Sequence, residues 1–337
     1  MPWAPSFSHL YVEKEALGYP LAKAIMERFP NSELVQISDY KEVFNRPKQN
    51  FEQQKKSSQL ILAVKKDHFL YDGSRFVQDH DNPNFHYNAL SLNCVYDCSY
   101  CYLQGMYGSA NQVCFVNLDD FFAATTEAIV QRRKPEHPLY LCISYDTDLL
   151  AFESVAPYSR KWIEYCTGRE GDLLIEIRTK SANFSALADL KPQSGVILAW
   201  SISPEKVCRQ YEHRAPGQNA RIKAMSAAVQ AGWQVRLCID PILPVNEWKD
   251  AYRELVDSVF NEIEPGSLLD AHIGVFRMNT GFFRNIRKRR QPVDLYYRPW
   301  QRANDTVTHS QEERANLTGF VRNLLSTKLP EGCIRTW

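Results

Sequence analysis

From about residue 85 onward, stretches patterned as β-strands alternate with stretches patterned as amphipathic helices, and this alternation limits the folds open to the chain. The predicted strands are 86–92, 139–145, 172–178, 195–201, 233–240 and 270–277. The predicted helices between them are 118–133, 149–166, 182–190, 219–231 and 247–263. Repeated strand–helix units favour a parallel sheet covered by helices. Because these units are too few to close an eight-stranded barrel, the sequence predicts an α/β fold of the partial (βα)6 TIM-barrel type.

The residues on either side of this alternation are predicted to form smaller parts. Before it, the pattern indicates a helix at 21–29, strands at 33–38 and 58–66, and a polar irregular stretch at 41–56. After it, Leu317, Val321 and Leu324 share one face of a predicted helix at 311–326. The predicted division is an N-terminal α/β extension at 1–84, a partial-barrel core at 85–280, and a C-terminal basic loop and helix at 281–337.

Two residues are predicted to mark helix ends. Asn246 precedes the helix at 247–263, and an Asn side chain there can accept a hydrogen bond from the first turn. Gly232 follows the helix at 219–231, at a position where a left-handed residue commonly ends a helix.

Three cysteines lie close together in the core part of the sequence. Cys94, Cys98 and Cys101 have the spacing C-x3-C-x2-C. Thiolates are the usual protein ligands of iron–sulfur clusters, and three on one loop can bind three irons of a [4Fe-4S] cubane. The fourth iron then lacks a protein ligand, and an open metal position is typical of catalytic rather than structural sites. The loop follows the predicted strand 86–92, and sites in parallel α/β barrels lie at the C-terminal ends of strands.

A structural zinc site is the alternative interpretation of these cysteines. It would use the three thiols together with Cys114 or a histidine. Structural zinc sites favour two closely spaced ligand pairs, whereas the remaining cysteines are isolated: 114, 142, 166, 208, 238 and 333. Buried, unliganded cysteines are the other alternative, although three within eight residues are hard to explain by packing alone.

Charge and cysteine content exclude several classes of protein. Lys and Arg number 40 against 39 Asp and Glu, so any surface that binds a polyanion must be a local patch. No apolar run is long enough to span a membrane, and the N-terminus does not resemble a secretory signal. The nine cysteines are not spaced as a disulfide framework, which favours the reducing cytoplasm.

The cysteine motif resembles that of the radical S-adenosylmethionine (SAM) enzymes, and further motifs resemble the spore photoproduct lyase family. The residues that carry the likeness are Cys98–Gln104 (CSYCYLQ), Cys142–Asp146 (CISYD), Thr179–Lys180, Trp200–Ser203 (WSIS) and Ala16–Leu21 (ALGYPL). The resemblance extends over roughly residues 8–265. One departure is that Tyr145 stands between Ser144 and Asp146.

The resemblance implies a fold, two cofactors and a reaction. Radical SAM enzymes typically have a six-unit partial barrel, and their open iron chelates SAM. An electron from the cluster cleaves SAM to a 5′-deoxyadenosyl radical. In spore photoproduct lyase this radical removes a hydrogen atom from a methylene-bridged thymine dimer in DNA, and the bridge then fragments. The expected function is therefore a radical SAM DNA repair lyase that needs a reductase, or a flavodoxin- or ferredoxin-type protein, as electron donor.

The same resemblance implies roles for individual residues. Cys142 would donate a hydrogen atom to the product radical, and a thiol suits this because its S–H bond is weaker than most C–H bonds. Tyr102 is the preferred relay that regenerates SAM, and Tyr100 would pack near the adenine of SAM. The residues that match SAM contacts are Ser144, Lys180 and Ser201. The alternatives are a buried apolar thiol, half-buried aromatic rings and a solvated lysine.

A basic segment follows the predicted barrel. The candidate DNA-binding residues are Arg284, Arg287, Lys288, Arg289, Arg290, Tyr297 and Arg298. Such a patch can contact several phosphates, and the neighbouring aromatic residues can stack on bases. A solvated helix end is the alternative. Because a barrel mouth cannot reach into a duplex, DNA repair requires the thymine lesion to be flipped out.

Two other functional classes stay open from the sequence. One is a radical SAM enzyme that acts on RNA, a protein or a small molecule. The other is a non-catalytic binding protein stabilised by zinc. In either case the expectation is a cytoplasmic protein without a membrane partner, present as a monomer or a weak dimer.

Overall fold

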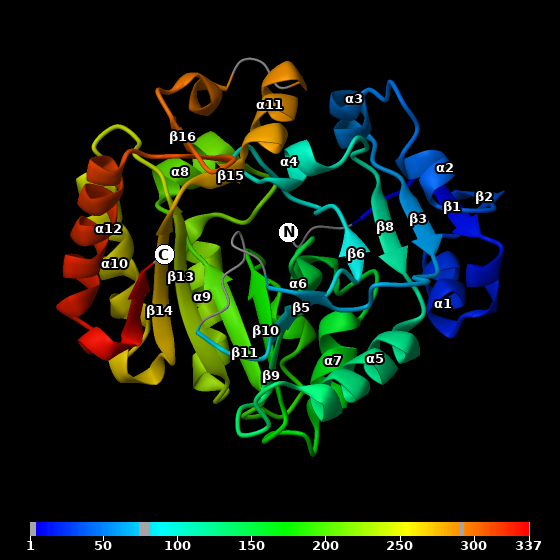
Figure 1. Cartoon of the computed structure of the whole chain (residues 1–337), viewed down its shortest axis with the longest axis horizontal. Helices are drawn as coiled ribbons and strands as arrows, with labels where there is room; N and C mark the ends of the chain where they lie inside the picture. Colours follow the sequence, from blue (N-terminus) through cyan, green and yellow to red (C-terminus); the bar gives the residue numbers. More distant parts are fainter. Residues whose placement is uncertain (1–4, 74–80, 290–292, 337) are drawn as a thin grey trace. The chain divides into compact units, whose positions relative to one another are not determined.

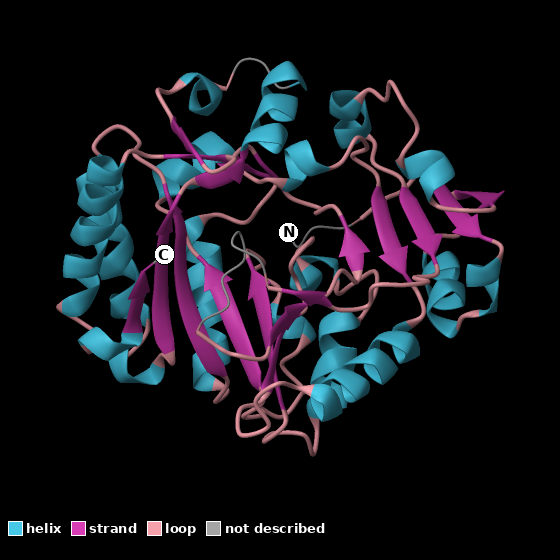
Figure 2. Ribbon diagram, in the orientation of Figure 1, coloured by secondary structure: helices cyan, strands magenta, loops and turns pink. Residues whose placement is uncertain are grey.

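The structure, a computed structural model, describes residues 5–73, 81–289 and 293–336. The described chain divides into two compact α/β units (Figures 1 and 2). Unit 1 consists of Met1–Val95, Tyr107–Arg178 and Gln193–Val196, and unit 2 consists of Tyr96–Met106, Thr179–Pro192 and Ile197–Trp337. The three-part division predicted from the sequence stays a prediction.

The N-terminal residues of unit 1 build a mostly parallel sheet in the order β2-β1-β3-β8-β6, in which only β6 runs antiparallel to its neighbour. Its strands are β1 His9–Glu13, β2 Glu33–Ile37, β3 Leu60–Ala63, β6 Ser91–Leu92 and β8 Gln112–Phe115. Its helical segments are η1 Glu15–Gly18, α1 Pro20–Arg28, α2 Lys41–Phe44 and α3 Phe51–Lys56. Every residue of β3 is buried, as expected for a strand in the middle of a parallel sheet.

The remainder of unit 1 contains a second run of strands in the order β10-β9-β5-β4. These are β4 Tyr71–Asp72, β5 Phe85–Tyr87, β9 Leu139–Cys142 and β10 Leu173–Thr179, and β5, β9 and β10 are parallel. The helices are α5 Leu118–Gln131, α6 Leu149–Phe152 and α7 Tyr158–Cys166. The single helix predicted at 149–166 is wrong, because Pro157 lacks the N–H that a continuous helix would need and α7 begins directly after it.

Unit 2 is built on four parallel strands in the order β11-β13-β14-β18. They are β11 Val196–Ser201, β13 Gln234–Ile242, β14 Asp270–Val275 and β18 Ile334–Thr336. The helices of this unit are α8 Glu205–Tyr211, α9 Gln218–Gln230, α10 Trp248–Glu262 and α12 Gln311–Ser326. Helix α10 packs on α9 and α12 (Figure 1). Its apolar face, which includes Tyr252, Leu255 and Val259, is buried, as expected for apolar residues at helical spacing.

Smaller elements complete unit 2. The strands are β7 Asp97–Cys98, β12 Glu212–His213, β15 Arg277–Asn279, β16 Gln301–Ala303 and β17 Thr306–Thr308. The helical segments are α4 Leu103–Met106, η2 Phe184–Ala186, η3 Pro265–Ser267, α11 Thr280–Arg289, η4 Asp294–Tyr297 and η5 Glu331–Cys333. Strands β7 and β12 form an antiparallel pair, and β15, β17 and β16 form a small antiparallel sheet.

All six predicted strands of the alternation are present as β5, β9, β10, β11, β13 and β14. The first is shorter than predicted, because the chain leaves β5 after Tyr87 and pairs again as β6 with β8 of the other sheet. The cysteine loop therefore does not follow directly on the first strand of the alternation, as the sequence predicted. It follows β6.

Two predicted helical features are wrong for local reasons. The segment 182–190 forms only the short η2, because Thr179 Oγ1 and Ser181 Oγ accept hydrogen bonds from nearby backbone N–H groups and compete with a helix. Asn246 does not cap α10, since Glu247 occupies the cap position in a left-handed conformation. By contrast, Gly232 ends α9 with a positive φ of 87°, as predicted.

The polar stretch 41–56 is not wholly irregular. It contains α2 and α3, and Asn50 caps α3 by accepting a hydrogen bond from the Gln53 N–H at 3.0 Å. Within the described ranges, no helix combines the length and hydropathy needed to cross a membrane.

Candidate active site

The cysteine loop in unit 2 is held by strand pairing. Cys98, in β7, lies opposite Glu212 of β12 in the antiparallel register. The next residue, Ser99, donates its N–H to the Tyr211 carbonyl at 2.7 Å, and its own carbonyl accepts a hydrogen bond from the Tyr296 hydroxyl. The backbone around Cys98 is therefore fixed by two segments that lie far away in sequence.

Cys94 belongs to unit 1, and the residue before it has an unusual backbone conformation. Asn93 has a positive φ of 70°, a conformation that Asn adopts more readily than most residues. Its side-chain amide donates to the carbonyls of Ser109 at 2.8 Å and Asn111 at 2.7 Å. These bonds hold the turn directly before Cys94 in place.

None of the three motif cysteines forms a disulfide; Cys98 is buried, whereas Cys94 and Cys101 are partly exposed. Within the described residues, no three His, Cys, Asp or Glu side chains gather around the position of a single metal ion. The thiolates of a cubane bind separate irons, so they need not converge on one point. The chemistry of the donor set, three thiols on one short loop, fits such a cluster.

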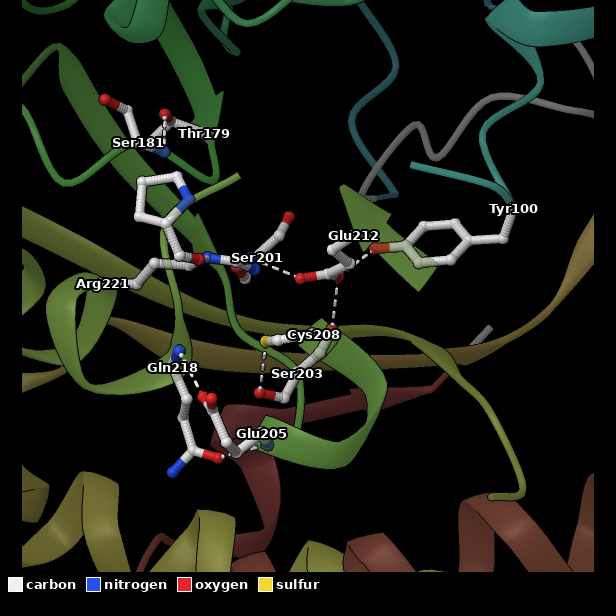
Figure 3. Close-up of polar contacts among 11 residues, drawn as sticks. Tyr100, Thr179, Ser181, Ser201, Ser203, Glu205, Cys208, Glu212, Gln218 and Arg221 are labelled. Atoms are coloured by element: carbon white, nitrogen blue, oxygen red, sulfur yellow. Dashed lines mark hydrogen bonds and ion pairs between the residues drawn. The ribbon is translucent and has the colours of Figure 1, made fainter. Parts of the chain in front are cut away.

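A buried carboxylate, that of Glu212, is hydrogen-bonded to Tyr100 of the cysteine loop (Figure 3). Glu212 accepts hydrogen bonds from the hydroxyls of Tyr100 and of Ser203, the latter at 2.8 Å, and forms an ion pair with Arg221. The side chains of Glu212 and Arg221 are both 0% exposed. Burial alone would raise the pKa of Glu212, but Arg221 and Lys180 lower it to about 2, so the carboxylate is ionised.

Arg221 extends this network to the end of β11. Its guanidinium donates to the carbonyls of Ser201 at 3.2 Å and Pro216 at 2.7 Å. Sequence reasoning missed Glu212, Arg221 and Ser203. The available signal was Arg221, an arginine next to Ile222 on a helix whose other charged residue, Lys223, is exposed.

The predicted SAM residues of unit 2 lie around the same loop. Lys180 is half-buried, and its ammonium lies 5.5 Å from the centre of the Tyr100 ring. Burial would lower the pKa of Lys180, but the Glu212 carboxylate and the thiols of Cys98 and Cys101 raise it above its ordinary value. Ser201 is the last residue of β11 and is buried.

Tyr100 and Tyr102 differ in their environments. Tyr100 is buried, and its hydroxyl is bound to Glu212. Burial and the Glu212 carboxylate hold the pKa of Tyr100 well above its ordinary value. Tyr102, directly after Cys101, is half-buried.

Cys142 ends β9 in unit 1 and is partly exposed. In the parallel register it is the partner of Tyr87 in β5 and of Glu176 in β10. Neighbouring residues in such a register point to the same face of the sheet, so the thiol shares its face with these two side chains. Glu176 is buried and accepts hydrogen bonds from the Tyr140 hydroxyl at 2.6 Å and from Arg178 Nε at 3.0 Å.

Ser144 lies two residues beyond Cys142 and is buried. Its hydroxyl oxygen accepts a hydrogen bond from the Arg178 N–H at 2.7 Å, which leaves the hydroxyl hydrogen free to donate. The residue absent from the family motif, Tyr145, packs on Tyr87 with ring centres 4.4 Å apart. Tyr71 stacks on Tyr87 in turn at 5.1 Å, which gives three neighbouring tyrosine rings.

The basic segment forms most of α11, which contacts α4 of the cysteine loop within unit 2. Gly105 allows this close approach, because a Cβ there would lie 2.2 Å from the Phe282 carbonyl oxygen. The Asn285 amide and the Arg289 guanidinium donate to the carbonyls of Gly105 and Gln104 at 3.0 and 3.2 Å. The cysteine loop is therefore fixed to the basic helix as well as to β12.

The candidate DNA-binding residues are in different environments. Arg284, Arg287 and Lys288 are exposed on α11, and Tyr297 is 50% exposed beneath the Arg287 guanidinium, 5.4 Å away. Arg298 instead contacts the Pro244 carbonyl and Tyr211 hydroxyl at 2.8 Å and Asp294 at 3.0 Å. Arg290 lies outside the described residues.

The family model of spore photoproduct lyase matches residues 4–289 of the chain, which include every motif described above. The chain belongs to the spore photoproduct lyase family. This family of radical SAM lyases is the one that the sequence motifs predicted. The match extends beyond the predicted limit at 265 and includes α11.

Curated members of the spore photoproduct lyase family are distant relatives of the chain. The lyase of a Geobacillus species is 25% identical over 276 residues, which span 80% of this chain and 77% of the relative. The lyase of Bacillus subtilis is 24% identical over 263 residues, which span 77% and 73%.

Solved structures of the family share the fold. A spore photoproduct lyase complexed with dinucleoside spore photoproduct has a TM-score of 0.81 and 21% identity, with 100% of this chain and 99% of that chain covered. A lyase variant with bound AdoMet and dinucleoside spore photoproduct has a TM-score of 0.82 and 22% identity over the same shares. The predicted α/β fold with mostly parallel strands, of the partial-barrel type, is confirmed.

Proposed function

We propose that the chain is a radical SAM lyase that reverses a methylene-bridged thymine dimer in DNA. The observation that carries the proposal is the family match over residues 4–289, which includes the three cluster cysteines and Cys142. Solved relatives that bind AdoMet and dinucleoside spore photoproduct support the cofactor and the substrate.

The cysteine loop provides the residues proposed to bind the cluster. Cys94, Cys98 and Cys101 would hold a [4Fe-4S] cluster, whose remaining iron has no protein ligand. When bound, cluster and SAM supply a 5′-deoxyadenosyl radical that removes a hydrogen atom from the lesion. Lys180 is a cation suited to the SAM carboxylate, and Ser144 and Ser201 offer hydroxyl groups at strand ends.

Cys142 would donate the hydrogen atom that completes repair. Its Sγ–H bond breaks homolytically and a C–H bond forms on the thymine carbon radical, which leaves a sulfur radical on Cys142. No thiolate is required, which agrees with a site whose nearest strand neighbours in the register are an aromatic ring and the carboxylate Glu176.

Tyr102 is the better candidate to return a hydrogen atom to Cys142. The Tyr100 hydroxyl donates its hydrogen to the Glu212 carboxylate in the buried network. Loss of that hydrogen would break a charge-assisted hydrogen bond in a buried site. Tyr100 stays the residue proposed to pack near the adenine of SAM.

The exposed face of α11 is the proposed phosphate-binding surface. Arg284, Arg287 and Lys288 carry its charge, and the half-exposed ring of Tyr297 is available for stacking on a base. A lesion bound beside Cys142 would have to be flipped out of the duplex. Arg289, Arg290 and Arg298 stay candidates, and Arg298 and Arg289 would first have to give up backbone partners.

The remaining parts of the proposal are a cytoplasmic location, a flavodoxin- or ferredoxin-type electron donor, and a monomer or weak dimer. They agree with the lack of disulfides among the described cysteines and with the need of the cluster for an electron.

The test is lesion turnover by the anaerobically reconstituted protein with SAM, a reductant and ultraviolet-irradiated dry DNA. Restored thymine together with 5′-deoxyadenosine, both followed by mass spectrometry, would support the proposal. Formation of 5′-deoxyadenosine without restored thymine would contradict it and indicate a different substrate, such as RNA, a protein or a small molecule. A colourless zinc protein would overturn the whole assignment.

A further inference from the structure

The Glu212 carboxylate has contacts that no step of the proposed function uses. It belongs to β12, opposite Cys98, and so lies beside the backbone that carries one cluster ligand. Its oxygens are hydrogen-bonded to Tyr100 of the cysteine loop and to Ser203, two residues beyond the end of β11. One charged group thus connects the loop to the end of a barrel strand (Figure 3).

Stability alone does not explain a charged pair at this position. The side chains of Glu212 and Arg221 are fully buried, and taking two ions out of water costs several kcal/mol, on the order of what their attraction returns. Apolar residues of similar size would often give an equally stable core. The pair does supply fixed hydrogen bonds: Glu212 accepts from Tyr100 and Ser203, and Arg221 donates to the Ser201 carbonyl.

The charge of Glu212 also lies in the surroundings of the cluster ligands. Cys98, one of the proposed cluster ligands, is the strand partner of Glu212, and the Glu212 carboxylate is hydrogen-bonded to Tyr100, the residue directly before Cys101. The carboxylate is therefore held next to the segment that carries two of the proposed ligands. Net charge and hydrogen bonding around an iron–sulfur cluster set its reduction potential.

We propose that Glu212 is a positioning residue for the cluster. Its carboxylate holds the cysteine loop in place through the Tyr100 hydroxyl, and its negative charge lowers the reduction potential of the bound cluster. The proposal rests on the proposed function only in that the loop must bind a cluster; it does not depend on the identity of the substrate.

The first test is the reduction potential of the reconstituted Glu212→Gln protein, measured by a redox titration followed by electron paramagnetic resonance. The substitution keeps the shape of the side chain and removes its charge, so the potential should shift to a more positive value. An unchanged potential in a variant that retains its iron would overturn the proposal.

Asp270→Asn is the matched control for this measurement. Asp270 forms a buried ion pair with Arg236 at 2.6 and 2.8 Å, but it is the first residue of β14 and so lies at the strand end away from the barrel mouth. This variant should lose stability and keep the wild-type potential. An equal shift in both variants would mean that loss of any buried carboxylate changes the potential, and would overturn the specific role of Glu212.

The second test remains available if Glu212→Gln does not fold. Tyr100→Phe keeps the Glu212–Arg221 pair and removes only the hydroxyl that connects the loop to it. Loss of a hydrogen bond to a charged group should speed the release of iron to a chelator by roughly tenfold or more. Tyr252→Phe, which removes a buried hydroxyl bonded to the Leu243 N–H, is the control and should release iron at the wild-type rate.

An unchanged release rate in Tyr100→Phe would overturn the positioning role while leaving the proposed function intact. A wild-type protein that binds no cluster after anaerobic reconstitution would instead contradict the proposed function itself. The two failures are therefore distinguishable in one set of samples.

Discussion

The surroundings of the cysteine loop in unit 2 and those of Cys142 in unit 1 differ in how their charged side chains are buried and paired. Around the loop, Glu212 and Arg221 are fully buried and paired. Around Cys142, Glu176 is buried, but its partner Arg178 keeps a side-chain exposure of 27%, and the remaining neighbour is the ring of Tyr87. The contrast agrees with the proposed roles, because net charge and hydrogen bonds around a cluster set its reduction potential, whereas a thiol that donates a neutral hydrogen atom needs no counter-charge.

The largest effect is expected from replacing the cysteines of the loop itself. Replacing Cys94, Cys98 or Cys101 by Ala should abolish cluster binding, because each supplies one iron with its ligand, and with it the cleavage of SAM. Iron content and 5′-deoxyadenosine formation measure this. Cys208→Ala, which removes a buried thiol of α8, is the control and should keep both. SAM cleavage that survives a motif substitution would show that the ligand set is different.

Cys142→Ala should change the fate of the substrate radical without changing the cluster. The variant should still cleave SAM, because the cluster residues are intact, but the thymine radical should be diverted into aberrant adducts for lack of a hydrogen donor. Mass analysis of the nucleoside products checks this. Cys166→Ala, a buried thiol in α7 of the same unit, should give clean repair. Clean repair by Cys142→Ala would remove this thiol from the mechanism.

The stability of variants at Arg221 and Arg178 tests the contrast between the two regions. Arg221→Met leaves the buried Glu212 carboxylate without its counter-charge, and breaking a buried pair in this way typically costs about 3–5 kcal/mol. Arg178→Met should cost less, because the Arg178 side chain is 27% exposed and the buried Glu176 carboxylate keeps the hydrogen bond from the Tyr140 hydroxyl. Urea unfolding of the cluster-free proteins measures both, and equal losses would contradict the contrast.

A rise from acid to neutral pH should change the contributions of Glu212 in unit 2 and Glu153 in unit 1 to stability in opposite directions. The pKa of Glu212 is about 2, below its ordinary 4.5, so its stabilisation is present above pH 4.5 and is lost as the pH falls toward 2. Burial raises the pKa of Glu153 in unit 1 from 4.5 to about 7, so its stabilisation is present below pH 4.5 and is lost as the pH rises toward 7.

Glu153→Gln tests the second half of this expectation. The carboxylate accepts hydrogen bonds from the N–H groups of Ser159 and Arg160 at the start of α7, which a Gln side chain can partly replace. Thermal unfolding between pH 4.5 and 7 should therefore vary less with pH in the variant than in the wild type. A slope identical to that of the wild type would show that Glu153 is ionised throughout.

The smallest expected effect concerns DNA. Lys288→Ala on α11 should weaken binding by a few-fold, equally for all sequences, and reduce the slope of log affinity against log salt by about 1. Lys161→Ala, an exposed lysine of α7, is the control. A slope that falls equally in both variants would argue against a phosphate contact specific to α11.

Motifs and helix patterns could be predicted because they depend on residues that are near in sequence. The spacing of Cys94, Cys98 and Cys101 predicted the family, and α12 has the predicted bounds. The errors arose where short-range hydrogen bonds or proline decide the backbone, as at Ser181 and Pro157. The roles of Cys142, Ser144, Lys180 and Ser201 stay predictions.

By itself, the sequence determined the order of the six barrel strands and the family, because hydrophobic period and motif spacing are local properties of the chain. Cys94, Cys98 and Cys101 stay the predicted cluster ligands. Only the tertiary structure revealed that Glu212 lies opposite Cys98 and shares its carboxylate with Tyr100 and Arg221. Cys98 and Tyr100 are separated from Glu212 by more than 100 positions along the chain, and a single glutamate directly after helix α8 carries no local sign of these partners. Burial of a charge becomes visible only when the strands and helices around it are assembled.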